Sequence, residues 1–137
     1  MADVIITAGD VRLEARFEER AAPRTSAALR DMLPFVSQIV HVRWSGEAVW
    51  VPMGELHLDL PPENATTYPS PGQILLYPGG ISETEILIAY GATHFASKAG
   101  SLAGNHVLSV TAGAERLRGI GEQTLWHGAL PLRIELV

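Results

Sequence analysis

The chain has 137 residues, of which 47% are hydrophobic and 18% are charged, and its formal net charge at pH 7 is -5. This size and apolar content predict one domain over residues 1–137, and the low charge content favours a homo-oligomer. The acidic excess and the lack of a basic cluster argue against a nucleic-acid partner. Because there is no cysteine, disulfides, thiol catalysis and Cys-containing zinc sites are excluded.

The first residues, MADVIITAGDVRLEARF, lack the basic start and apolar run of a signal peptide. No apolar stretch in the sequence reaches the length of a membrane span. We therefore expect a cytoplasmic protein without a membrane partner.

The first half of the chain predicts a hairpin, a helix and a second hairpin. Val11–Phe17 alternates apolar and charged residues with a period of two, which is typical of a half-buried strand, and Val4–Thr7 is expected to pair with it. Pro23 suits the first turn of a helix that Pro34 ends. Its expected apolar stripe is formed by Ala28, Leu29, Met32 and Leu33. The second hairpin is predicted from strands at residues 38–44 and 48–51.

The second half begins with an irregular, Pro-rich excursion from Met53 to Gly72, with at most a short strand at Leu56–Leu60. Its length makes it a candidate for function or for an interface. The elements expected after it are strands at residues 74–77, 85–90, 106–110 and 132–136, with a short helix at 114–120. Many strands with one or two short helices indicate a mostly β protein, either a small barrel or a sandwich.

The order of these elements resembles that of the cyclophilins, and three stretches carry the resemblance. They are Ala22-Pro23-Arg24-Thr25 before a helix, His41-Val42-Arg43 where cyclophilins have an adjacent His-Arg pair with a catalytic Arg, and the turn Leu102-Ala103-Gly104-Asn105-His106-Val107. The resemblance implies a closed cyclophilin-like β-barrel with one or two short capping helices. HVRWSGEAVWVP, PENATTYPSPGQILLYPGG and SETEILIAYG are similar to an uncharacterised bacterial family of short cyclophilin-like proteins without an established activity.

Three charged residues are candidates for chemistry. His41 and Arg43 are two apart on the expected strand and so face the same way; the guanidinium would either bind a carboxylate or carbonyl oxygen, or pair with a neighbouring Glu at the barrel rim. Glu83 and Glu85 are also two apart, beside a Gly-rich loop. They would form an acid/base pair or simply solvate a strand end. The catalytic candidates are therefore Arg43, Glu83 and Glu85.

Aromatic residues are expected near the loops that ring the open side of the barrel, where they would form the apolar wall of a pocket, although each taken alone is more often part of a core. The ligand-binding candidates are Arg43, Trp44, Trp50, Tyr77, Tyr90, His94, Phe95 and Lys98. Together they predict a site for a small anionic or amide-bearing molecule or peptide. No motif indicates a cofactor, and a metal site from the Glu pair with His94 or His127 would need converging ligands, which the spacing does not guarantee.

Three functions remain open from the sequence. The first is a binding module with its ligand near Arg43, and the second is a small metabolic enzyme with Glu83 or Glu85 as acid/base and Arg43 or Lys98 as anion anchor. Prolyl isomerisation comes third. The chain has Glu85-Ile86-Leu87-Ile88 where cyclophilins carry Gln-Phe-Phe, so the pocket for a prolyl bond is incomplete.

Overall fold

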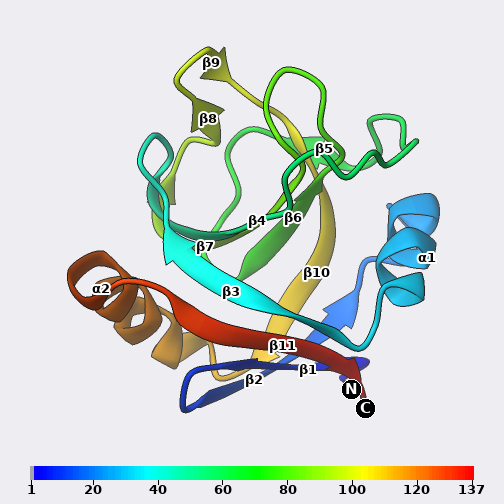
Figure 1. Cartoon of the computed structure of the whole chain (residues 1–137). Helices are drawn as coiled ribbons and strands as arrows, with labels where there is room; N and C mark the ends of the chain where they lie inside the picture. The colour runs from blue at the N-terminus through cyan, green and yellow to red at the C-terminus, as the bar shows by residue number, and fades with distance from the viewer. Residues whose placement is uncertain (1) are drawn as a thin grey trace.

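The computed structural model describes residues 2–137, which form a closed antiparallel β-barrel (Figure 1). Eight strands follow each other around it in the order β2-β1-β11-β3-β4-β7-β6-β10, and β10 pairs back onto β2. The mostly β class and the closed barrel predicted from the sequence are confirmed. The strands are β1 (Val4–Ala8), β2 (Val11–Phe17), β3 (Phe35–His41), β4 (Gly46–Pro52), β6 (Gln73–Tyr77), β7 (Glu85–Thr93), β10 (Gly104–Ala112) and β11 (Leu130–Leu136).

Two helices lie on opposite sides of the barrel (Figure 1). Leu29 of α1 (Pro23–Asp31) and Leu117 and Ile120 of α2 (Leu117–His127) pack into the same apolar cluster that fills the barrel interior. Burying one such side chain stabilises the fold by about 1.5–3 kcal/mol, so both helices are held by the core that they cover. Within residues 2–137, neither helix is long and apolar enough to cross a membrane.

A second apolar cluster covers the outer surface of β4, β6 and β7. Ile86 and Ile88 point into the barrel, whereas Leu87 between them points outward and lies opposite Leu75 of β6. Phe95 and Leu102 cover these residues from a later segment that carries the short strands β8 (Ala96–Ser97) and β9 (Gly100–Ser101). β6 and β7 are thus buried on both faces, which explains their unbroken apolar sequences.

The second hairpin differs from its predicted bounds. β3 begins at Phe35, directly after Pro34, because Phe35 already pairs with Ile134 of β11. β3 ends at His41, so Arg43 lies in the turn that precedes β4 and not on a strand. β4 starts at Gly46 with a φ of 94°, where a Cβ would lie 2.7 Å from the carbonyl oxygen of Ala92. Only glycine fits this close approach.

Two other elements also differ from the predictions. The strand expected at Leu56–Leu60 is absent; instead β5 (Ala65–Thr66) pairs with β10, while Leu58 and Leu60 pack on the core without strand pairing. The helix expected at residues 114–120 consists of a 3₁₀ turn, Ala114–Arg116, followed by α2, which continues to His127. The longer helix is explained by a buried face that extends to Thr124.

A polar network fixes the long loop of residues 53–72 to α1. No side chain at the N-cap position caps this helix; instead the Glu63 carboxylate accepts hydrogen bonds from the backbone N–H groups of Arg24 (3.2 Å) and Thr25 (2.8 Å). Desolvation raises the pKa of the Glu63 carboxyl, but these two bonds and a third from the Thr25 hydroxyl lower it, and the net shift is downward. Thr25 is itself fully buried, so the inner face of α1 includes hydroxyl groups beside the predicted apolar stripe.

Asn105 of β10 is the centre of this network. Its side chain is buried, donates to the Thr25 hydroxyl (3.0 Å) and the Pro61 carbonyl (3.0 Å), and accepts from the backbone N–H of Glu63 (3.1 Å). One amide therefore joins the barrel wall, the helix and the loop.

We expect Asn105→Ala to lower the free energy of unfolding by roughly 2–3 kcal/mol, because three hydrogen bonds of a buried side chain would be lost, one of them with the fully buried Thr25 hydroxyl. Urea denaturation followed by circular dichroism measures the change. Glu115→Ala, at an exposed position, is the control and should change stability by less than about 0.5 kcal/mol. Equal stabilities of the two variants would contradict the role assigned to Asn105.

Candidate functional site

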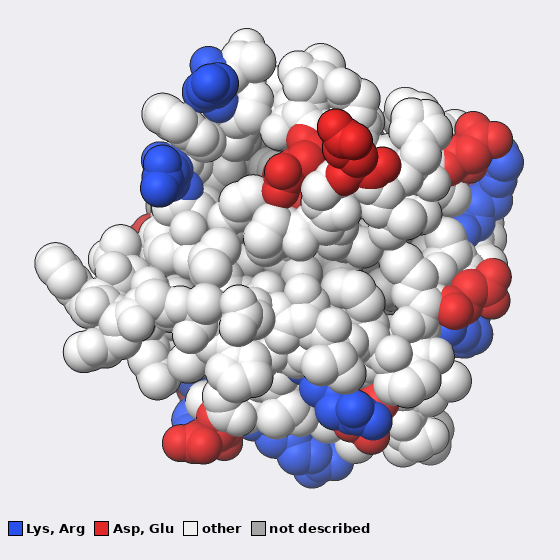
Figure 2. Space-filling model, in the orientation of Figure 1, with Lys and Arg blue, Asp and Glu red and all other residues white. Residues whose placement is uncertain are grey.

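A cavity of about 560 Å³ opens on the outer face of the barrel, between the β3–β4 turn, the start of β7 and the β8–β9 ribbon. Its volume lies within the range of small-molecule sites. Figure 2 shows a hollow in this region, with basic side chains on one rim and acidic side chains across from them. The cavity is lined by residues 40–45, Trp50, Ser82, Glu83, Glu85 and residues 96–98.

Two cations lie on the side of the turn and the ribbon. Arg43 belongs to the β3–β4 turn, and Lys98 follows β8 at the tip of the ribbon; both side chains are exposed. Five other arginines in residues 2–137 lie within 4.0 Å of a carboxylate, whereas neither Arg43 nor Lys98 does. Both positive charges are therefore available to a bound group.

The opposite side carries Glu83 and Glu85. β7 begins at Glu85, so Glu83 lies in the loop before the strand, and the two carboxyl groups reach the same cavity from different backbone conformations. Glu83 is exposed, while Glu85 is 6% exposed and lies beside the outer apolar cluster, opposite Tyr77 in the sheet register. Within the described chain, the Glu85 side chain forms no ion pair or hydrogen bond.

Burial, together with the smaller effect of the negative charge of Glu83, raises the pKa of Glu85 from its ordinary value of 4.5 to about 8. Near neutral pH this group is largely a neutral carboxylic acid, which can donate a hydrogen bond or a proton. Titratable groups shifted in this way are concentrated at functional sites.

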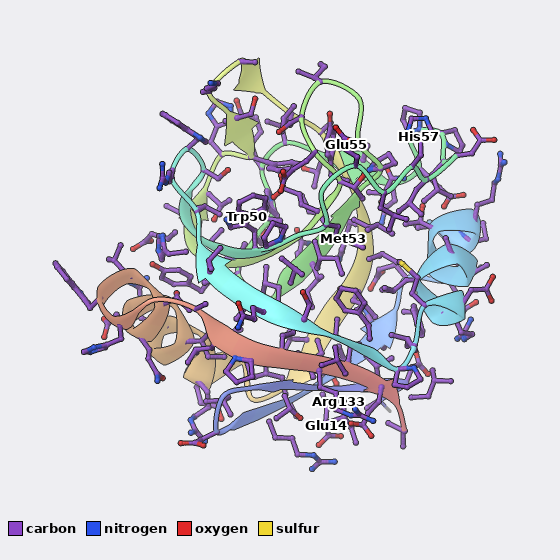
Figure 3. The ribbon with its side chains drawn as sticks, in the orientation of Figure 1. Glu14, Trp50, Met53, Glu55, His57 and Arg133 are labelled. Atoms are coloured by element: carbon purple, nitrogen blue, oxygen red, sulfur yellow. The ribbon has the colours of Figure 1, made fainter. Side chains whose placement is uncertain are left out.

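Aromatic side chains form the apolar part of the lining. Trp50 lies on β4 opposite Leu87 and therefore on the outer face of the sheet, where it packs against the second apolar cluster (Figure 3). Trp44 lies next to Arg43 in the turn and is 57% exposed. Two indole rings beside two free cations form a surface that suits a ligand with both an apolar body and a charged group.

Ser45 connects the β3–β4 turn, which carries Arg43, with the β8–β9 ribbon, which carries Lys98. Its hydroxyl donates to the carbonyl of Ala96 (3.1 Å) and accepts from the backbone N–H of the same residue (3.0 Å). Its backbone carbonyl also accepts from the N–H of His94 (2.9 Å). The β3–β4 turn and the β8–β9 ribbon are thus held together behind the cavity, although the sequence analysis did not single out Ser45.

Two of the predicted ligand-binding residues lie behind the cavity wall. The Tyr77 hydroxyl accepts hydrogen bonds from the backbone N–H groups of Ile81 (3.1 Å) and Ser82 (3.4 Å), so it supports the loop that leads to Glu83. Phe95 is 1% exposed and meets the Tyr77 ring edge-on, with 5.6 Å between ring centroids. Both support the cavity without being part of its lining.

Tyr90 and His94, two further predicted ligand-binding residues, do not line the cavity. Tyr90 belongs to the barrel core, and its hydroxyl lies 2.7 Å from Nε2 of His41. Its ring packs so closely against α2 that a Cβ at Gly121 would lie 2.3 Å from it. His94 lines a separate shallow hollow beside Thr93, and its ring nitrogen lies 2.7 Å from the Ser101 hydroxyl.

The structure therefore brings together Arg43, Trp44, Trp50, Glu83, Glu85 and Lys98 from the candidates expected on the sequence. His41 also lines the cavity, but its ring is held by Tyr90 and by the carbonyl of Val42 (2.8 Å). Over residues 2–137, no three His, Asp or Glu side chains are grouped closely enough to hold a metal ion.

Comparison with known proteins identifies the family. The family model described as a protein of unknown function, DUF3830, matches residues 4–136. The chain belongs to the DUF3830 family. No curated protein matches it in sequence.

Solved structures share the fold of this DUF3830 protein. The structure of McbB in complex with tryptophan is 17% identical and aligns over 96% of the chain with a TM-score of 0.75. The chain spans only 44% of McbB. The solution structure of the hypothetical protein AF2241 from Archaeoglobus fulgidus is also 17% identical, with a TM-score of 0.68, and the alignment covers 99% of this chain and 95% of AF2241.

The raised pKa of Glu85 predicts how stability depends on pH. The folded state keeps the proton up to about pH 8, whereas the unfolded chain releases it near pH 4.5, so the folded state binds more protons between these values. Stability should therefore fall as the pH rises through this window. Glu85→Gln removes this loss, and at pH 9 we expect it to be more stable than the wild type by on the order of a few kcal/mol.

Urea denaturation of both proteins between pH 5 and pH 9 measures this difference. Glu83→Gln is the control, because it removes an exposed charge and should leave most of the dependence in place. Parallel stability curves for the wild type and Glu85→Gln would show that the Glu85 carboxyl is solvated in the folded protein.

Proposed function

We propose that this DUF3830 protein binds a small ligand with an anionic or amide group, a metabolite or a short peptide, in the cavity beside Arg43. The main observation is the guanidinium of Arg43, which has no carboxylate within 4.0 Å among residues 2–137 and lies next to Trp44 in a cavity of suitable volume. A guanidinium presents a planar fork of donors that matches a carboxylate or the oxygen of an amide. Lys98 adds a second, more flexible positive charge.

The comparison with McbB supports a small molecule over a peptide. McbB shares the fold and is in complex with tryptophan. Tryptophan combines a carboxylate with an indole ring, and the cavity of the DUF3830 protein offers cations beside aromatic side chains. At 17% identity the similarity concerns the fold, so the proposal depends on the lining residues of this chain.

A second candidate function is acid/base catalysis, with Glu85 as the proton-transferring group. The supporting observation is that its carboxyl group is buried, lines the cavity and has no hydrogen-bond partner in residues 2–137, while its pKa of about 8 is close to neutral. A catalytic pKa near the working pH gives the best balance between the correct protonation state and proton-transfer strength. Arg43 or Lys98 would then anchor the substrate anion.

Three further proposals accompany the binding function. We propose that the protein works in the cytoplasm, which its lack of cysteine fits, and that it assembles as a homo-oligomer, which its low charge content supports. Prolyl isomerisation stays a prediction from the cyclophilin resemblance. Light scattering in solution measures the subunit number, and an assay with a proline-containing peptide tests the isomerase activity directly.

The binding proposal predicts that Arg43→Ala loses affinity for anionic ligands. A thermal-shift screen of small carboxylates and amides identifies ligands of the wild type, and we expect the variant to bind the carboxylates at least tenfold more weakly, because a charge-assisted pair is lost. Arg116→Ala removes an exposed arginine that does not line the cavity and is the matched control. Ligands that bind Arg43→Ala as well as the wild type would contradict the anchor role.

The catalytic proposal predicts hydrogen exchange in a bound carbonyl compound. In D₂O, the ionised form of Glu85 would take a proton from the carbon next to the carbonyl and leave an enolate, exchange that proton with the solvent, and return a deuteron to the carbon, which NMR detects. We expect Glu85→Gln to slow this exchange by at least about 100-fold, the usual contribution of a positioned base. Equal exchange rates in both proteins would leave binding as the only function of the cavity.

A further inference from the structure

The charges around the cavity are separated by sign. Arg43 and Lys98 come from the β3–β4 turn and the β8–β9 ribbon, whereas Glu83 and Glu85 come from the loop before β7 and its first residue. Figure 2 shows the two colours on opposite sides of the hollow. The cavity therefore has a positive and a negative end.

These charges do not neutralise each other. Neither cation has an oxygen of Glu83 or Glu85 within 4.0 Å, although close pairs form elsewhere on the same surface, such as Arg118 with Glu47 at 3.0 Å. Opposite charges that line one cavity without contact leave room for a molecule that meets both. A ligand with only a carboxylate would meet the cations and leave the acidic end of the cavity, Glu83 and Glu85, without a partner from the ligand.

We infer that the ligand is a zwitterion, with a carboxylate held by Arg43 and Lys98, an ammonium group held by Glu83 and Glu85, and an apolar or aromatic body against Trp44 and Trp50. This inference rests on the proposed binding function and narrows its ligand to the chemical class of α-amino acids and similar amino acids. Indole rings suit both the apolar body and the ammonium group of such a ligand, because they pack against apolar groups and attract cations.

Binding of the ammonium group has a consequence for Glu85. The titratable groups that line the same cavity are Glu83, His41, Arg43 and Lys98, and Tyr77 lies opposite Glu85 in the sheet register. Glu55 follows Met53 and Gly54, which form backbone hydrogen bonds with Thr84 next to Glu85. The ammonium would bring a positive charge next to Glu85 and favour its ionised form. The complex would therefore release a proton near pH 7.5, where free Glu85 is mostly protonated.

The experiment compares ligands that differ by one group. The phenyl series is L-phenylalanine, 3-phenylpropanoate, which lacks the ammonium, and 2-phenylethylamine, which lacks the carboxylate; L-tryptophan, indole-3-propanoate and tryptamine form the matching indole series. Calorimetry at pH 7.5, in two buffers with different ionisation enthalpies, gives the affinity and the protons released. We expect the amino acid in at least one series to bind at least tenfold more tightly than both analogues, with proton release.

Glu85→Gln should abolish the proton release and reduce the preference for the amino acid over the propanoate to less than threefold, while Glu122→Gln, an exposed change on α2, should preserve both. Propanoates that bind as tightly as the amino acids would overturn the zwitterion inference and still support an anion site at Arg43. If no member of either series binds, the zwitterion inference is wrong, and the outcome of the carboxylate and amide screen then decides the binding proposal separately.

Discussion

The burial of β6 and β7 on both faces is the constraint on which the rest of the molecule depends. A barrel strand ordinarily has one face toward the core and one toward water, but Leu75, Leu87 and Phe95 form a second apolar layer outside the wall. This layer holds the segment after β7 against the barrel and so places the β8–β9 ribbon beside the β3–β4 turn. The cavity is the space that remains where the outer layer ends.

The same layer explains the unusual environment of Glu85. The residue is at the outward-facing position that continues the pattern of Leu87, so its carboxyl lies at the edge of apolar packing and not in bulk water. Such a position lowers the stability of the folded protein at pH values at which an exposed carboxyl would be ionised. Groups with such shifted pKa values are concentrated where binding or chemistry uses them, so the outer apolar layer also determines the chemical character of the cavity.

The sequence predicts those features that depend on local pattern. The alternation in Val11–Phe17 identifies β2, and Arg43, which the resemblance to a barrel family singles out, lines the cavity. The sequence does not reveal that Glu85 is buried, because a solvated residue at the start of a strand would also stand directly before an apolar run. Nor does it reveal that Glu63 caps α1 from 38 residues away or that Ser45 binds Ala96, since both contacts follow from the tertiary fold.

The ribbon has one more consequence, for how barrels of this kind diverge. β8 and β9 pair only with each other in the described chain and stand beyond the barrel wall in Figure 1, with Lys98 and Ala99 at their tip. Exchanging or lengthening these tip residues changes the mouth of the cavity while every strand pairing of the barrel stays in place. New ligand preferences can therefore arise at this tip without a change in the barrel. The tip is also the natural place to introduce such preferences by design.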